Sequence, residues 1–124
     1  MSQPSSPRIS LPLPADERQA ENRRRLREFL RAIPRNEPDN TLELLGSTAT
    51  LPARTTTRAE LTKAIEQLRP RMRQIIHRTL EEGWSREEVC SSLHISLRTL
   101  ERDQAGGLDL LIGLAQLQRE ASQM

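Results

Sequence analysis

The sequence predicts an all-α protein, a helical bundle of five to seven helices that includes an N-terminal amphipathic helix and contains no sheet. Two observations support this fold class. Apolar residues recur at spacings of three and four along much of the chain, and no β-branched run alternates with polar residues. Two Ser/Thr-x-x-Glu capping boxes, which begin at Thr57 and Ser85, mark the starts of two helices. The 124 residues leave room for one small domain with tails.

Composition excludes several classes of protein. Hydrophobic residues make up 35% of the chain and charged residues 29%, so the core must be small. No apolar run approaches the ~18 residues of a membrane span, and the first fifteen residues contain no apolar block of a signal peptide. The one cysteine permits no internal disulfide, which fits a reducing cytoplasm. We therefore expect a cytoplasmic protein that does not bind membranes.

The positive charge is almost entirely arginine. Of 19 basic residues only Lys63 is lysine, and the net charge is +2. Arginine suits phosphate and guanine because its planar group donates two parallel hydrogen bonds. A genome rich in arginine codons would produce the same bias, so this feature alone decides nothing.

The N-terminal part divides into an arm, a helical segment and a linker. Residues 1–15 contain four prolines and predict a disordered arm. In segment 16–46, Asp16 is expected to cap a helix that runs to Ile33, and a short helix over Thr41–Leu45 is expected to end at Gly46. Residues 47–56 are Thr-rich and aperiodic, which predicts a linker to a domain over 57–124.

The first predicted helix has an apolar stripe and an opposite arginine face. Its apolar residues follow the i, i+3, i+4, i+7 pattern: Leu26, Phe29, Leu30 and Ile33. The arginines could bind phosphate or a polymerase, or could be the solvated side of an amphipathic helix. They are Arg23, Arg24, Arg25, Arg27 and Arg31.

Two further helices are expected between Thr57 and Gly83. The first carries Leu61, Ile65 and Leu68 on one face, and Pro70 is placed to begin the second. Gly83 is the expected left-handed stop of the second helix. Its apolar stripe is formed by Met72, Ile75, Ile76 and Leu80.

The stretch from Trp84 to Gln104 has the pattern of a helix-turn-helix. The capping box at Ser85 starts a helix at Arg86, the pattern breaks at His94–Ile95, and Ser96 can cap a second helix. Cys90 is the small residue that a steep helix crossing needs, and Trp84 is expected to pack under the turn. The apolar seal between the helices is Val89, Leu93, Ile95 and Leu100. A plain helical hairpin without a DNA role would show the same pattern.

Residues 68–111 resemble the fourth region of bacterial sigma factors, and equally the phage late-gene regulators of the ArpU and RinA type. The matching pieces are LRPRMRQII, LEEGWSREEV and HISLRTLERD. The usual turn glycine of the family is His94 here, and an apolar position late in the recognition helix is Asp103. The resemblance implies a sequence-specific DNA-binding transcription regulator of phage or mobile-element origin that contacts RNA polymerase. The alternative is an adaptor that binds RNA polymerase or a sigma factor without reading DNA sequence.

The resemblance also implies which residues contact double-stranded DNA. The residues expected to read bases project from the side of the second helix opposite Leu100; they are Leu97, Arg98, Glu101 and Arg102. The helix before a helix-turn-helix often crosses the phosphate backbone. The expected phosphate contacts are Arg71, Arg73, Arg78, Ser96 and Thr99.

The final segment, from Leu108 to the C-terminus, carries two apolar stripes. The first, which suffices to pack the domain, is Leu108, Leu111, Ile112 and Ala115. The second is Leu110, Leu114 and Leu117, which predicts a partner contact, most simply a homodimer. The rival expectation is that the N-terminal helix folds back and covers this second stripe. Gly106–Gly107 would allow a sharp turn before this helix.

No enzyme, cofactor or metal site is expected. Cys90 and His94 stand four residues apart on a helix, but a closed zinc site needs four ligands and only His77 remains. No Gly-rich phosphate loop, serine elbow or H-E-x-x-H run is present in the sequence.

Overall fold

The computed structural model describes residues 13–46 and 53–122, with side chains on the last helix as far as Gln116. The predicted arm therefore lies mostly outside the described residues, as does the larger part of the predicted linker. None of the described helices is both long enough and apolar enough to cross a membrane.

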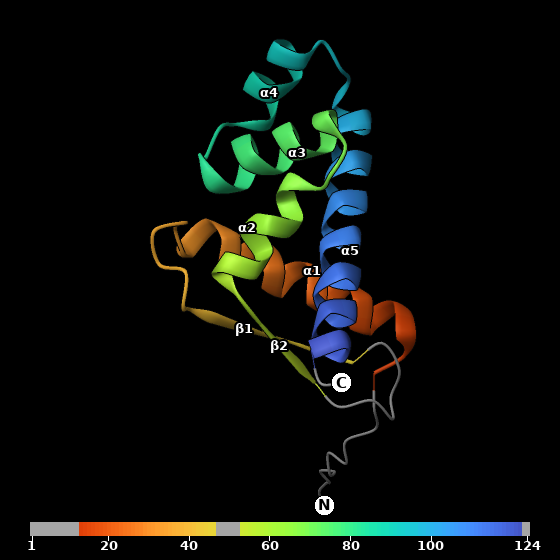
Figure 1. The fold of residues 1–124 in the computed structure, drawn as a ribbon. Helices are drawn as coiled ribbons and strands as arrows, with labels where there is room; N and C mark the ends of the chain where they lie inside the picture. Colours follow the sequence, from red (N-terminus) through yellow and green to blue (C-terminus); the bar gives the residue numbers. More distant parts are fainter. Residues whose placement is uncertain (1–12, 47–52, 123–124) are drawn as a thin grey trace, which may run out of the picture.

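The described chain is mainly α-helical and is arranged along one long helix. The elements are α1 (Ala15–Ala32), β1 (Thr41–Leu44), β2 (Arg54–Thr57), α2 (Arg58–Glu66), α3 (Pro70–Ile76), the π-helical turn η1 (His77–Glu81), α4 (Arg86–Leu93) and α5 (Leu97–Ser122). In Figure 1, α3 and α4 lie beside the first half of α5, whereas α1 crosses its second half, close to the two strands.

The expectation of no sheet is wrong. Strands β1 and β2 pair antiparallel, with Thr41 opposite Thr57 and Leu44 opposite Arg54. The predicted helix over Thr41–Leu45 is therefore a strand, and β2 begins inside the predicted linker. A single helical turn leaves most of its backbone groups unpaired, whereas pairing with β2 satisfies them and buries Leu44.

The predicted helix boundaries are largely confirmed. Thr57 Oγ1 accepts a hydrogen bond from the Glu60 amide at 3.1 Å, and Glu60 accepts one from the Thr57 amide at 2.9 Å. Pro70 is the first residue of α3, and Gly83 adopts a φ of +75° after η1. Asp16 lies in the first turn of α1, but the residue at the N-cap is Pro14.

One hydrophobic core joins the N-terminal helix to the C-terminal helix. Leu26 and Leu30 of α1 are buried in the same cluster as the predicted first stripe of the final segment, which confirms that stripe. Residues of the predicted segment 16–46 and of the predicted domain 57–124 thus share a core. Its buried members are Leu26, Leu30, Leu44, Leu61, Ala64, Ile65, Leu68, Ile76, Leu80, Leu108, Leu111, Ile112 and Ala115.

The expected turn at Gly106–Gly107 is wrong, because both glycines lie inside the continuous α5. Their small size serves close packing instead. A Cβ on Gly107 would lie 3.3 Å from Ile76 Cγ1, and one on Gly106 would lie 3.3 Å from Met72 Cε. The glycines therefore let α3 approach α5, and α5 continues without a break from Leu97 to Ser122.

A buried charge cluster around Glu81 ties η1 to α1 and α2. Glu81 Oε2 accepts a hydrogen bond from Arg58 Nη2, and both side chains are almost fully buried, with exposed fractions of 6% and 1%. Arg35, which follows α1, donates two hydrogen bonds to Glu81 at 3.0 and 2.9 Å. Glu81 Oε1 also lies 2.7 Å from His77 Nδ1. Arg58 in turn donates to the Ile33 carbonyl oxygen at 2.8 Å, at the C-terminal end of α1.

Candidate nucleic-acid interface

The first helix of the predicted helix-turn-helix is fixed by its capping box. Ser85 Oγ accepts a hydrogen bond from the Glu88 amide at 3.1 Å, and Glu88 Oε1 accepts one from the Ser85 amide at 2.9 Å. These bonds satisfy amides that have no partner inside the helix. Helix α4 therefore begins at Arg86, as the sequence predicts.

The turn after α4 passes through a left-handed residue. His94 has φ 57° and ψ 47°, a region that histidine tolerates better than most side chains. Two residues later, Ser96 Oγ accepts a hydrogen bond from the Thr99 amide at 3.1 Å and so caps α5, which begins at Leu97. The turn and the second cap are as expected from the sequence.

A small apolar cluster holds the two helices against α3. Ile75, Val89 and Leu100 are completely buried in it. Around them pack the partly buried side chains of Cys90, Leu93 and Ile95. This confirms the predicted seal. The cluster is separate from the main core, so α3, α4 and the start of α5 form a unit with its own packing.

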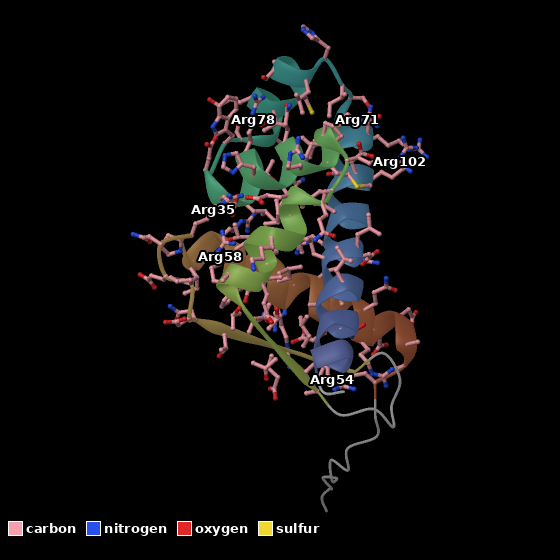
Figure 2. The ribbon with its side chains drawn as sticks, viewed as in Figure 1. Arg35, Arg54, Arg58, Arg71, Arg78 and Arg102 are labelled. Atoms are coloured by element: carbon pink, nitrogen blue, oxygen red, sulfur yellow. The ribbon has the colours of Figure 1, made fainter. Side chains whose placement is uncertain are left out.

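The four predicted base-reading residues all lie on exposed parts of α5. Leu97 is 46% exposed, and Arg102 projects away from α5 in Figure 2. Neither Arg98 nor Arg102 forms an ion pair with any carboxylate that the structure describes. Glu101 differs, because its carboxylate lies 2.9 Å from Arg86 Nη1 at the start of α4.

Of the predicted phosphate contacts, Arg71 is the one oriented by α5. Its Nε donates to Asp103 Oδ2 at 2.6 Å, while its side chain stays 52% exposed (Figure 2). Asp103, which replaces an apolar residue of the related pattern, is thus buried as the counter-charge of Arg71. This role was not predicted, and its one signal in the sequence is an acid at a position where the resemblance implies an apolar residue.

The other predicted phosphate contacts are spread over the unit. Arg78 Nη1 donates to Ser92 Oγ at 2.6 Å, and Arg73 Nη1 donates to the Glu66 carbonyl oxygen at 3.3 Å. Ser96 and Thr99 lie in the cap of α5, with their hydroxyl oxygens 3.0 Å apart. Arg71 and Arg78 lie toward opposite ends of the α3–η1 segment, as Figure 2 shows, so the structure does not gather these residues at one point.

Trp84 does not pack under the turn. Its side chain is exposed, and the Arg78 guanidinium lies 4.8 Å from the centre of its ring. The seal is filled by aliphatic side chains, so the indole stays outside and makes a cation–π contact.

The three leucines predicted to bind a partner have different surroundings. Leu110 is 49% exposed, whereas Leu114 is partly buried and packs against the main core. The side chain of Leu117 lies outside the described residues. Helix α1 packs on α5, as the rival expectation required, and covers mainly the first stripe.

The homodimer stays a prediction that one variant can test. Leu110→Glu should leave the fold unchanged, because the side chain is exposed. If the dimer forms through the face of α5 that carries Leu110, the introduced carboxylate should weaken self-association at least about tenfold, as measured by sedimentation equilibrium. Leu114→Glu is the poorer probe, since it would place a carboxylate against the core. A wild-type chain that is monomeric at every micromolar concentration would contradict the dimer.

Comparison of the chain with protein-family models, with curated proteins and with solved structures gave no match.

Proposed function

We propose that the chain is a sequence-specific DNA-binding transcription regulator that reads double-stranded DNA with the first turns of α5. The observation that supports this most is a pair of helices joined by a short turn, the second of which presents two exposed arginines that pair with no carboxylate of the described residues. Ser85 and Ser96 cap α4 and α5, His94 forms the left-handed turn between them, and the seal packs the two helices together. Such a helix pair can place its second helix in a major groove.

Arg98 and Arg102 are the proposed base readers. They stand four residues apart, one helical turn, so their side chains leave the same side of α5. Each guanidinium can donate two hydrogen bonds to the O6 and N7 edge of a guanine. Leu97 can contact a thymine methyl group, and the Arg86 ion pair fixes the position of Glu101 beside these two arginines.

Arg71 is the proposed phosphate contact whose side chain is oriented by a residue of α5. Asp103 holds its Nε, so the two terminal nitrogens remain available to a phosphate oxygen. Because the side chain is already oriented by a buried partner, less conformational entropy is lost when it binds. Contacts to RNA polymerase or to a sigma factor stay predictions, and they call for a separate binding measurement.

The test compares base-reading and phosphate-binding variants on selected DNA. We expect Arg98→Ala and Arg102→Ala each to lose about 1–3 kcal/mol of discrimination between the preferred site and a site with the guanine replaced. Arg71→Ala should weaken binding to both sites by the same factor. The preferred site comes from selection on random duplexes, and affinities are measured by fluorescence anisotropy.

Two outcomes would overturn the proposal. Wild-type protein that binds every duplex alike, weakly and without preference, would favour the adaptor function. A preferred site that both arginine variants still discriminate as the wild type does would remove these residues from the base-reading role.

A further inference from the structure

Helix α1 carries two groups of arginines that differ in how they are neutralised. In the first group, Arg24 lies 2.7 Å from Glu21 and 3.0 Å from Glu28, and Arg25 lies 2.9 Å from Glu21. Hydrogen bonds from Arg24 and then Arg25 lower the pKa of the Glu21 carboxyl to about 2. This paired group therefore has a balanced network of charges and little residual attraction for an anion.

The second group has no such network. Arg27 and Arg31 form no ion pair with a carboxylate of the described residues. They stand one turn apart, about 6 Å along the helix axis. Arg23, one turn earlier, pairs with Asp109 of α5 at 2.7 Å. Within the described part of the chain, no hydrogen-bonded carboxylate therefore neutralises Arg27 or Arg31.

The surroundings of Arg27 are themselves positive. Its side chain is half-buried, and this burial lowers the pKa of the guanidinium, as do the charges of Arg31, Arg23 and Arg86. Glu28 opposes this effect but contributes least. The charges of three neighbouring arginines thus disfavour the charged form of Arg27, an effect that a bound anion would relieve.

This arginine pair lies beside the proposed DNA-reading surface. Arg86, whose charge acts on Arg27, is the first residue of α4 and pairs with Glu101 on α5. Arg23 anchors α1 to Asp109, two turns beyond Glu101 on α5. Helix α1 packs across α5, as Figure 1 shows, and Arg27 follows Arg23 by one turn, on the side of α1 that carries this ion pair to α5.

We propose that Arg27 and Arg31 form a second, sequence-independent contact to the phosphate backbone of the duplex that α5 reads. The inference rests on the proposed function and adds to it a binding surface outside the helix-turn-helix. Guanidinium groups donate charge-assisted hydrogen bonds to phosphate oxygens, and such contacts fix the register of a protein on DNA without reading bases. A duplex that extends beyond the bases read by α5 would supply these phosphates.

The experiment measures how DNA affinity depends on salt. The variants are Arg27→Gln and Arg31→Gln, singly and together, and the control is Arg24→Gln, which removes an arginine of the paired group from the same helix. Each phosphate contact contributes about 0.9 to the slope of log K against log salt concentration. We expect the double variant to make this negative slope shallower by about 2, and we expect the control to leave it unchanged. The ratio of affinities for the preferred and unrelated sites should stay constant.

A second arm uses duplex length. Wild-type protein should bind a duplex with long flanks more tightly than one trimmed to the preferred site, and the double variant should bind both alike. A general effect of net charge would not depend on the flanks in this way. Arg31 is exposed, so the single variant Arg31→Gln can be used for the test if Arg27→Gln destabilises the protein. Arg27→Lys keeps a positive charge and should restore part of the salt dependence that Arg27→Gln loses.

The two proposals can fail separately. Wild-type protein that shows no preferred site overturns the proposed function and this inference with it. A wild type that reads its site through Arg98 and Arg102, while the double variant keeps the wild-type slope and flank dependence, overturns the inference alone.

Discussion

Glu81→Gln should destabilise the protein by about 3–5 kcal/mol, because it removes the carboxylate that pairs with buried Arg58. Glutamine is nearly the same size, so packing is kept while the charge is lost. Arg58 would then remain buried without a counter-charge, and Arg35 and His77 would lose the same partner. Urea unfolding at neutral pH, followed by circular dichroism, measures the change.

The same carboxylate should make stability depend on pH in the acid range. Burial alone would raise the pKa of Glu81, but hydrogen bonds from Arg35, His77 and Arg58 outweigh it and lower this pKa from 4.5 to about 2. A carboxyl with a lowered pKa stabilises the fold fully above its unfolded value, and this contribution is lost as the pH falls from about 4.5 toward 2. The wild type should therefore lose stability across this interval more steeply than Glu81→Gln does.

Glu82→Gln is the matched control. Its carboxylate lies one residue further along the chain, is 42% exposed and faces His77 Nε2 at 2.9 Å. Partly exposed pairs of this kind contribute about 0–1 kcal/mol, so this variant should unfold close to the wild type. Equal effects of the two substitutions would contradict the interpretation that Glu81 is the centre of a buried charge cluster.

The sequence predicts those parts of the fold that depend on local contacts. The capping boxes at Thr57 and Ser85, the proline that begins α3 and the left-handed Gly83 each act within a few residues. Their hydrogen bonds and backbone angles are set by the residues themselves. The helix boundaries of the predicted helix-turn-helix were predictable for this reason, since the turn and both caps lie within Ser85–Thr99.

Three of the errors involve partners far away in the chain. Whether residues 41–44 form a strand depends on β2, and the role of Asp103 depends on Arg71, 32 residues earlier. Gly107 was predicted to be a turn residue, whereas its small size serves the close approach of Ile76, 31 residues earlier. The arginines of α1 form one face in the sequence, and only Glu21, Asp109 and Arg86 divide it into a paired and an unpaired part.

Leu100→Ala should destabilise the helix-turn-helix by about 2–5 kcal/mol, the usual range for a fully buried leucine. Leu100 closes a cluster that has only two other completely buried members, Ile75 and Val89. So small a cluster has few neighbours that can move in to fill the space left by the removed atoms. We expect the variant to have a lower melting temperature than the wild type, and its amide hydrogen exchange to be accelerated in α4 more than in α1.

Leu97→Ala is the control for this substitution, because the same side chain is shortened on the same helix. Leu97 is 46% exposed and lies three residues before Leu100, outside the apolar cluster. Its removal should change the free energy of unfolding by no more than about 0.5 kcal/mol. If Leu97 contacts a base, Leu97→Ala should weaken DNA binding while the fold is kept. A Leu100→Ala variant that melts like the wild type would show that α4 and α5 are not held together by this cluster, and the helix-turn-helix would lose its structural basis.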